Sequence, residues 1–314
     1  MYEIIRPDTT EEWKELRTHG IGSSEIAIVI RANKWETPTK LWMRKRAQRE
    51  GTWVEEVSEE QQTAFDLGHI LEDYIAEWFS NKTGYEIDED SKGDWIAKSD
   101  RHEWMQASPD RIYKRGDEIG ILEIKTTHID FAKEDMPIYY FCQLQYQMGI
   151  MGVKHGAVAW LNKNNDKKDY QEFDFNEEFF ETMIEVGNAF WEENIIGGKE
   201  PEPSSAEELS ILYPKSEDKS VEIDDDGYDA LVRIADLNRT ISELEIERDA
   251  LLFESKKRCE SSDKMTYKGE VVATYKSNKD SEVFDTKRFK EEHPEMVKQY
   301  MTKRTGARPF KLKI

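Results

Sequence analysis

Two carboxylates and a lysine occur at a spacing that could assemble a metal site. Ser108-Pro109-Asp110 is followed, after twelve intervening residues, by Glu123-Ile124-Lys125. This gap suits a strand, a turn at 114–118 and a returning strand, on which period-two alternation puts Glu123 and Lys125 on one face. Asp110, at the start of the first strand, can face the same point. Two carboxylates and the backbone carbonyl of Ile124 are hard oxygen donors of the kind that Mg²⁺ prefers.

The chemistry of such a site is hydrolysis of a phosphate ester. Bound Mg²⁺ can polarise a phosphate oxygen and generate hydroxide from water, while Lys125 orients that water or stabilises developing charge. A Glu-x-Lys pair alone is usually a surface charge pair, but the apolar strand around it and the preceding Pro-Asp make this pattern more specific. No nucleophile elbow indicates acyl transfer, and the two cysteines, Cys142 and Cys259, form neither a Cys-x-x-Cys zinc pair nor a four-cysteine iron–sulfur site.

The surrounding sequence predicts an α/β domain of about 200 residues to hold these groups. Apolar periodicity and capping patterns predict helices within 8–50, over 60–80, over 137–150 and over 176–194. Strands are expected at 85–87, 104–107, 111–113, 119–126, 156–161 and 170–175.

A change of pattern near residue 200 divides the chain. We expect a first domain over 1–199, a Pro- and Ser-containing linker over 200–221 and a C-terminal extension over 222–314. In the extension a heptad-like series predicts a helix that forms either an intramolecular helical hairpin or a coiled-coil dimer; its members are Ile234, Leu237, Ile241, Leu244 and Leu251. A β-hairpin over 265–275, a helix over 285–301 and a closing strand over 308–314 are expected to follow.

Composition indicates a folded, charged protein. The chain has 314 residues, 37% of them hydrophobic and 35% charged, and a net charge of −21. The ends are basic, with a net charge of +2 over 1–50 and +7 over 255–314, which is compatible with a local phosphate track or with ordinary solvated surface. The longest apolar run, Ile26–Ile30, is too short to span a bilayer, for which about 18 residues are needed, and the N-terminus shows no secretory signal. A cytoplasmic protein with reduced thiols and no membrane partner is expected.

The core motifs resemble those of the PD-(D/E)XK nuclease superfamily. Further segments, in the same linear order, resemble the YqaJ-like viral recombinase family, which includes phage lambda exonuclease. They are residues 17–25, Gly68-His69-Ile70-Leu71-Glu72 and the glutamine-rich segment 143–148. The resemblance covers roughly residues 10–195. It implies a restriction-endonuclease-like core, with a mixed central sheet flanked by helices, here followed by an α+β extension.

The resemblance also implies roles for individual residues. Asp110, Glu123 and the Ile124 carbonyl would bind metal, Glu72 would approach the same metal, and Lys125 would be the catalytic lysine. A terminal 5′-phosphate would be held by a guanidinium with hydroxyl and amide donors; these are Arg17, Ser24, Ser108 and Gln143.

Simpler interpretations of these residues stay open. Glu72 could be simple surface, and Ser24 could only cap its helix. Arg17 could pair with the acids at 11–15, and Gln147 could replace Gln143.

The implied activity is that of a phage- or prophage-encoded exonuclease of the bacterial cytoplasm. It would use Mg²⁺, with Mn²⁺ as a substitute, to degrade duplex DNA from its ends in the 5′ to 3′ direction. The exposed 3′ strand would pass to a strand-annealing recombinase, and the enzyme would form a homo-oligomer, suspected to be a trimeric ring. Two alternatives stay open: an endonuclease or nickase with the same fold, and a DNA-end-binding or recombinase-docking protein with little activity.

Overall fold

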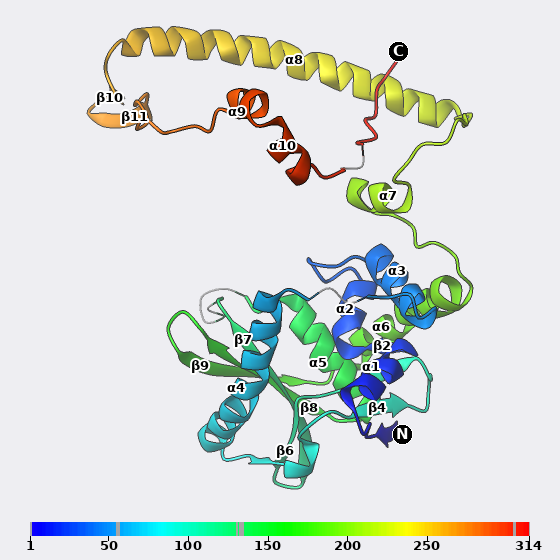
Figure 1. The fold of residues 1–314 in the computed structure, drawn as a ribbon. Coiled ribbons are helices and arrows are strands. Elements are labelled where there is room, and N and C mark those ends of the chain that lie inside the picture. The colour runs from blue at the N-terminus through cyan, green and yellow to red at the C-terminus, as the bar shows by residue number, and fades with distance from the viewer. Residues whose placement is uncertain (1, 55–56, 130, 132–134, 304–305, 314) are drawn as a thin grey trace. The chain divides into compact units, whose positions relative to one another are not determined.

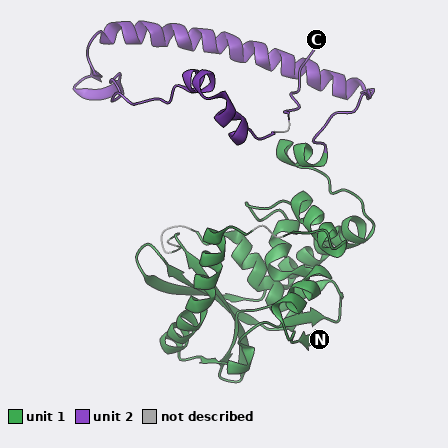
Figure 2. Ribbon diagram, in the orientation of Figure 1, with its two compact units in different colours: residues 1–212 green, residues 213–314 purple. Residues whose placement is uncertain are grey.

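The structure is a computed structural model that describes residues 2–54, 57–129, 131, 135–303 and 306–313 (Figure 1). The chain divides into two units, residues 1–212 and residues 213–314 (Figure 2). The first unit contains all of the residues to which the sequence assigns chemistry.

A five-stranded mixed sheet forms the centre of the first unit, in the order β3-β6-β7-β8-β9. Its strands are β3 (Glu86–Ile87), β6 (Arg111–Arg115), β7 (Glu118–Thr127), β8 (His155–Asn162) and β9 (Lys167–Asp174). β7 pairs antiparallel with β6 and parallel with β8. A parallel pair needs a crossover connection, which is supplied here by helix α5 (Ile138–Met151). The expected hairpin from β6 to β7 and the expected helix after it are confirmed.

The two faces of the central sheet are covered by different helices. On one face Leu122 and Ile124 of β7 pack in a cluster with Ile75 and Phe79 of α4 (Glu59–Thr83), which lies along the sheet in Figure 1. On the other face Ile121 joins the larger core cluster that contains the buried residues of α5. Since successive side chains of a strand point to opposite faces, Glu123 and Lys125 share the α5 side with Ile121.

A smaller sheet and the remaining helices complete the first unit. Its strands follow the order β1-β4-β5-β2, in which β2 and β5 are parallel; they are β1 (Tyr2–Ile5), β2 (Ile21–Gly22), β4 (Ile96–Ser99) and β5 (Met105–Ala107). The other elements are α1 (Thr10–Thr18), α2 (Ser23–Val29), α3 (Pro38–Arg49), the 3₁₀ turn η1 (Glu89–Ser91), α6 (Glu177–Ala189) and the π-helix η2 (Phe190–Ile196). The expected apolar run of 26–30 is a buried part of α2 and its end.

Residues 200–212, within the expected linker, belong to the first unit. They include helix α7 (Ala206–Leu212). Arg31 donates to the Glu202 carbonyl at 2.8 Å, and Lys40 Nζ lies 2.6 Å from Glu207. The buried Glu208 also lies 3.7 Å from Arg31. These ion pairs hold the segment to α3 and to the residue that follows α2.

The second unit contains a long helix, a hairpin and two short helices. These are α8 (Asp225–Cys259), β10 (Lys264–Tyr267), β11 (Glu270–Thr274), α9 (Thr286–Glu292) and α10 (Pro294–Tyr300). α8 is one unbroken helix of 35 residues, so the described residues form no hairpin of two long helices. The five heptad residues remain 40–64% exposed, and their pairing in a coiled-coil dimer stays a prediction.

Two expectations for the end of the chain are wrong. The helix predicted over 285–301 is interrupted at His293, because Pro294 lacks the N–H that would continue it and begins a new helix instead. Residues 308–313 alternate in polarity but form no strand; no described strand pairs with them, and an unpaired strand leaves its backbone groups unsatisfied. Ile314, the last residue of that expected strand, lies outside the described residues. No helix among the described residues is long and apolar enough to cross a membrane.

Gly120, in strand β7 of the β6–β7 hairpin, provides a test of this packing. A Cβ at Gly120 would lie 2.1 Å from Cζ of Tyr113, its cross-strand partner, whose ring is fully buried and stacked on Tyr85. Gly120→Ala is therefore expected to lower the free energy of unfolding by about 1–3 kcal/mol. All nine tryptophans lie in the first unit, so urea unfolding followed by tryptophan fluorescence reports on it alone.

Gly68 in α4 is the matched control. A Cβ there meets no atom within 4 Å, and Gly68→Ala is expected to stabilise the unit by up to about 1 kcal/mol. Equal effects at the two positions would contradict the packing of Tyr113 over Gly120.

Candidate active site

The β6–β7 hairpin brings the predicted acids and lysine together. Asp110 directly precedes β6, and its Oδ2 accepts a hydrogen bond of 2.6 Å from the backbone N–H of Ile124. Glu123, on the strand just before Ile124, is 0% exposed. The ammonium of Lys125 donates to Glu123 Oε1. The three charged groups thus lie around one point, and Ile124 takes part through its backbone N–H.

Helix α5 closes around the Glu123 carboxylate from the other side. Gln143 Nε2 donates to Oε1 at 2.6 Å and Gln147 Nε2 donates to Oε2 at 2.8 Å. Residues four apart share a helix face, so one turn of α5 supplies both donors. Gln147 also lies 3.3 Å from Ser23 Oγ. The sequence indicated that these glutamines share a face, but it did not predict that both amides would hold Glu123.

The acids repel one another in a buried setting. Burial raises the pKa of Glu123, the charge of Asp110 raises it further, and hydrogen bonds from Lys125 and Gln147 leave it at about 7. Burial likewise raises the pKa of Asp110, against the opposing effect of Lys125. Burial lowers the pKa of Lys125, but Glu123 and Asp110 outweigh it and hold that pKa above its usual value. The lysine therefore keeps its proton, and the two acids hold protons more readily than isolated carboxylic acids do.

Glu72 reaches the site from α4 and is held by an arginine. Its Oε2 lies 3.5 Å from Nη1 of Arg111, whose side chain is 7% exposed and also binds Asp73 at 2.9 Å. His69 lies 3.1 Å from the other oxygen of Glu72. The negative charge of Glu72 contributes to the raised pKa of Asp110. Arg111 was not among the predicted site residues, because a strand arginine next to an aspartate has no local signature for a contact with a helix 38 residues away.

Three of the four predicted phosphate-binding side chains, Arg17, Ser24 and Ser108, gather where β2 and β5 end, whereas the fourth, Gln143, is bonded to Glu123. In the parallel pair β2–β5, Gly22 is opposite Gln106, so the chain leaves both strands in the same direction and carries Ser24 and Ser108 to the same edge. Arg17 Nη2 lies 3.3 Å from Ser24 Oγ, and its guanidinium lies over the Trp13 ring at 4.5 Å.

One cavity of about 920 Å³ joins the two sides. All eight side chains assigned from the sequence line it: Arg17, Ser24, Glu72, Ser108, Asp110, Glu123, Lys125 and Gln143. These residues come from six separate stretches of chain, so their convergence on one cavity is a property of the fold and not of local sequence.

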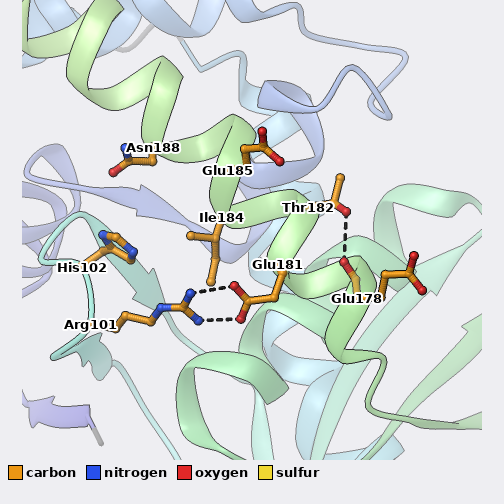
Figure 3. A pocket seen from close by; sticks show the side chains of 8 residues that line it. All are labelled: Arg101, His102, Glu178, Glu181, Thr182, Ile184, Glu185 and Asn188. Atoms are coloured by element: carbon orange, nitrogen blue, oxygen red, sulfur yellow. Dashed lines mark hydrogen bonds and ion pairs between the residues drawn. The ribbon is translucent and has the colours of Figure 1, made fainter.

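A second hollow, of about 530 Å³, contains none of these residues (Figure 3). It lies beside α6, where Arg101 and Glu181 form a two-pronged ion pair at 2.5 and 2.6 Å. The carboxylate of Glu181 is thereby occupied, and its pKa is lowered by the hydrogen bonds from Arg101. This hollow lies on the surface of the first unit, and Glu178 and Glu185 also line it.

The donor chemistry of the first cavity fits a divalent cation. Asp110 and Glu123 offer only oxygen atoms, and their mutual repulsion is the condition that a cation would relieve. Among the described residues no group of three or more His, Cys, Asp or Glu side chains is already gathered for a metal. Glu72 is bound by Arg111 and His69, and both oxygens of Glu123 accept hydrogen bonds. Asp110 and Glu123 are the acids of the β6–β7 hairpin that could hold a cation.

Comparison with known proteins agrees with the sequence motifs. Residues 12–154 match the model of the YqaJ-like viral recombinase domain, which confirms the resemblance drawn from the motifs. The uncharacterized protein YqaJ of Bacillus subtilis (strain 168) is 26% identical over 313 residues, which covers 96% of this chain and 94% of that protein.

Solved structures with the same fold include that of LHK-Exo in complex with dAMP. It has 21% identity, a TM-score of 0.50, and covers 65% of this chain and 97% of that chain. Another structure of LHK-Exo, an alkaline exonuclease from Laribacter hongkongensis, has 22% identity and a TM-score of 0.49, and covers 59% and 92% of the two chains. The predicted mixed central sheet flanked by helices is confirmed.

The raised pKa of Glu123 predicts a pH-dependent stability in the absence of divalent cations. Its pKa is about 7 in the folded chain against 4.5 for an ordinary glutamate, so the folded state binds more protons between these values. The free energy of unfolding should therefore fall as pH rises from about 4.5 to 7, by on the order of 3 kcal/mol. Asp110, whose pKa is also raised, contributes in the same direction. Urea titrations with a chelator present, at several pH values, measure this change.

Glu123→Gln is expected to flatten that dependence, because the amide does not titrate. Glu77→Gln, at an exposed position of α4, is the control and should leave it intact. A wild-type protein and a Glu123→Gln protein with the same slope between pH 4.5 and 7 would contradict the assignment.

Proposed function

We propose that this chain, whose residues 12–154 match the YqaJ-like viral recombinase domain, is a metal-dependent DNA exonuclease that starts at the 5′ ends of duplex DNA. The observation that carries the proposal is the single cavity in which Asp110, Glu123 and Lys125 face Arg17 and Ser24. A related fold has been solved with dAMP, and a 5′-mononucleotide is the product that such a reaction releases. This likeness supports a nucleotide-releasing activity for the present chain.

The acids and the lysine divide the work of hydrolysis. Mg²⁺, or Mn²⁺ in its place, would be held by Asp110 and Glu123, with Glu72 close by, and would supply Lewis acidity and a more acidic water. Lys125 keeps its proton, so it acts as a donor and not as a general base. Its ammonium can hold the attacking water or neutralise charge that develops on the phosphoryl oxygens. Gln143 and Gln147 keep the Glu123 carboxylate oriented during this step.

The cationic side of the cavity supports a preference for strand ends. A terminal phosphate carries about 1.5 to 2 negative charges at neutral pH, more than the single charge of an internal phosphodiester. Arg17 offers a planar set of donors suited to phosphate oxygens, and the Ser24 and Ser108 hydroxyls line the same space. A 5′-phosphate bound there would place the first phosphodiester toward Lys125.

Recombination is the biological setting that we propose. Removal of one strand from its 5′ end leaves a 3′ single strand, which is the substrate of a strand-annealing recombinase. The description of the matched domain as a viral recombinase domain supports this setting, and a homotrimeric ring around duplex DNA remains our proposal for the assembly.

The activity is tested with linear and closed circular duplexes of one sequence in Mg²⁺. We expect the linear duplex to be degraded from its 5′ ends, the closed circle to remain intact, and chelation to stop the reaction. Lys125→Met, Asp110→Asn and Glu123→Gln should each reduce the rate by about 100-fold or more. Glu77→Gln serves again as the unaffected variant.

The outcomes separate the competing functions. Cutting of the closed circle would favour an endonuclease or nickase. Binding to DNA ends without degradation, by the wild-type protein, would favour the end-binding protein. Full activity of Lys125→Met would remove the lysine from the mechanism.

Arg17→Ala tests recognition of the 5′-phosphate separately from the hydrolysis step. The variant should lose most of its preference for 5′-phosphate over 5′-hydroxyl ends, by about tenfold or more, because hydrogen bonds to a charged group are each worth about 1.5–3 kcal/mol. Its rate on 5′-hydroxyl ends should change little. Rates on the two ends, measured at limiting substrate, give this ratio, and an unchanged ratio would exclude Arg17 from phosphate recognition.

A further inference from the structure

An acid and a lysine are buried behind the phosphate side of the cavity. Glu25 of α2 is 4% exposed and Lys45 of α3 is 1% exposed, and Lys45 Nζ lies 2.8 Å from Glu25 Oε2. Arg44 approaches the other carboxylate oxygen at 3.0 Å. Taking such charges out of water costs several kcal/mol, and their attraction often only offsets that cost. A gain in stability therefore does not by itself explain the buried pair.

Both members of the pair also bind backbone next to the phosphate-binding residues. Lys45 Nζ donates to the carbonyl oxygen of Arg17 at 2.8 Å. Glu25 Oε2 accepts the backbone N–H of Gly22 at 2.9 Å. Arg17 lies in the last turn of α1, and Gly22 directly precedes α2, which carries Ser24. The ion pair thus ties the end of one helix to the beginning of the next at the point where their polar side chains meet.

The Glu25 carboxylate is kept ionised for this task. Burial raises its pKa, but the charges of Lys45, Arg17 and Arg44 together lower it to about 2. The backbone of Arg17 is thus held by Lys45, and its charged side chain is attracted to Glu25, the partner of that lysine.

Anchoring matters because Arg17 lies between two hollows. The site cavity is on one side, and a separate cavity of about 400 Å³, distinct from the hollow of Figure 3, is on the other. Arg17 and Trp13 line both the site cavity and this separate cavity, while Lys45 lines only the separate cavity. An arginine with empty space on either side loses side-chain entropy when one orientation is imposed. The bond from Lys45 fixes the backbone from which the side chain starts, and Ser24 and the Trp13 ring contact its guanidinium.

We propose that Glu25 and Lys45 are positioning residues that hold Arg17 and Ser24 in the arrangement that recognises a terminal 5′-phosphate. The inference rests on the proposed function and extends it to two residues that do not themselves contact DNA. They set the preference for a phosphorylated end, whereas Asp110, Glu123 and Lys125 set the rate of hydrolysis.

Two variants separate positioning from folding. Lys45→Met removes the donor to the Arg17 carbonyl and leaves Glu25 paired with Arg44. The double variant Glu25→Gln/Lys45→Met removes both buried charges, so that neither is left unpaired, and retains an acceptor for the Gly22 N–H. Urea unfolding by tryptophan fluorescence identifies which variants are folded, and any folded one decides the question. Lys45→Arg keeps the charge and the donor and serves as the conservative replacement.

The readout is the ratio of degradation rates on 5′-phosphate and 5′-hydroxyl duplexes in Mg²⁺. We expect the ratio to fall by about tenfold or more in the folded methionine variants, since a displacement of about 1 Å in a positioned group can cost about 100-fold. The rate on 5′-hydroxyl ends should stay near that of the wild type, and Lys45→Arg should retain most of the preference. A merely structural role would lower both rates together.

The exposed ion pair of Figure 3 supplies the matched control. Arg101→Met/Glu181→Gln removes an exposed, two-pronged ion pair outside the site, and should leave the ratio unchanged. A folded Lys45→Met or double variant with the wild-type ratio overturns the inference alone. A wild-type protein that shows no preference between the two ends overturns the proposed recognition of phosphate, and the inference with it.

Discussion

A carboxylate that is fully removed from water must be compensated, and Glu123 is the group on which this requirement acts most strongly. Burial opposes its charge, so the lysine two residues along the same strand and two amides from α5 surround it. The bonds from the two amides connect α5 to β7, in addition to the apolar contacts around them. The acids repel one another all the same, and in the function that we propose a bound cation would relieve that residual repulsion.

The same physical rule applies to a second buried acid, which lies behind Arg17 and outside the site cavity. There the buried acid, Glu25, is surrounded by Arg17, Arg44 and Lys45, and its pKa is lowered instead of raised. The neighbouring positive charges more than offset the burial of Glu25, whereas the neighbours of Glu123 do not offset its burial. Both acids lie in the first unit. Of the three cations around Glu25 only Arg17 lines the site cavity, which it shares with Asp110, Glu123 and Lys125.

The parts of the site that sequence could predict are those set by local periodicity. Alternation along 119–126 placed Glu123 and Lys125 together, and helical spacing put Gln143 and Gln147 on one face. Arg17, Ser24 and Ser108 came from family resemblance, since only the parallel pairing of β2 with β5 brings them together. Arg111 and Lys45 could not be found, because a long-range ion pair leaves no periodic trace. Residues 308–313 show the reverse error, in which alternation occurs without a strand to pair with.

The crossover between β7 and β8 has a consequence for how this protein can change. Because parallel neighbours must be joined by a helix that packs back on the sheet, the same covalent connection that builds the fold also delivers the two amides to Glu123. The amides that bind Glu123 lie on a helix and not on a loop, so an exchange of surface loops would leave them in place. A substitution in α5 therefore affects both the packing of the sheet and the surroundings of the Glu123 carboxylate.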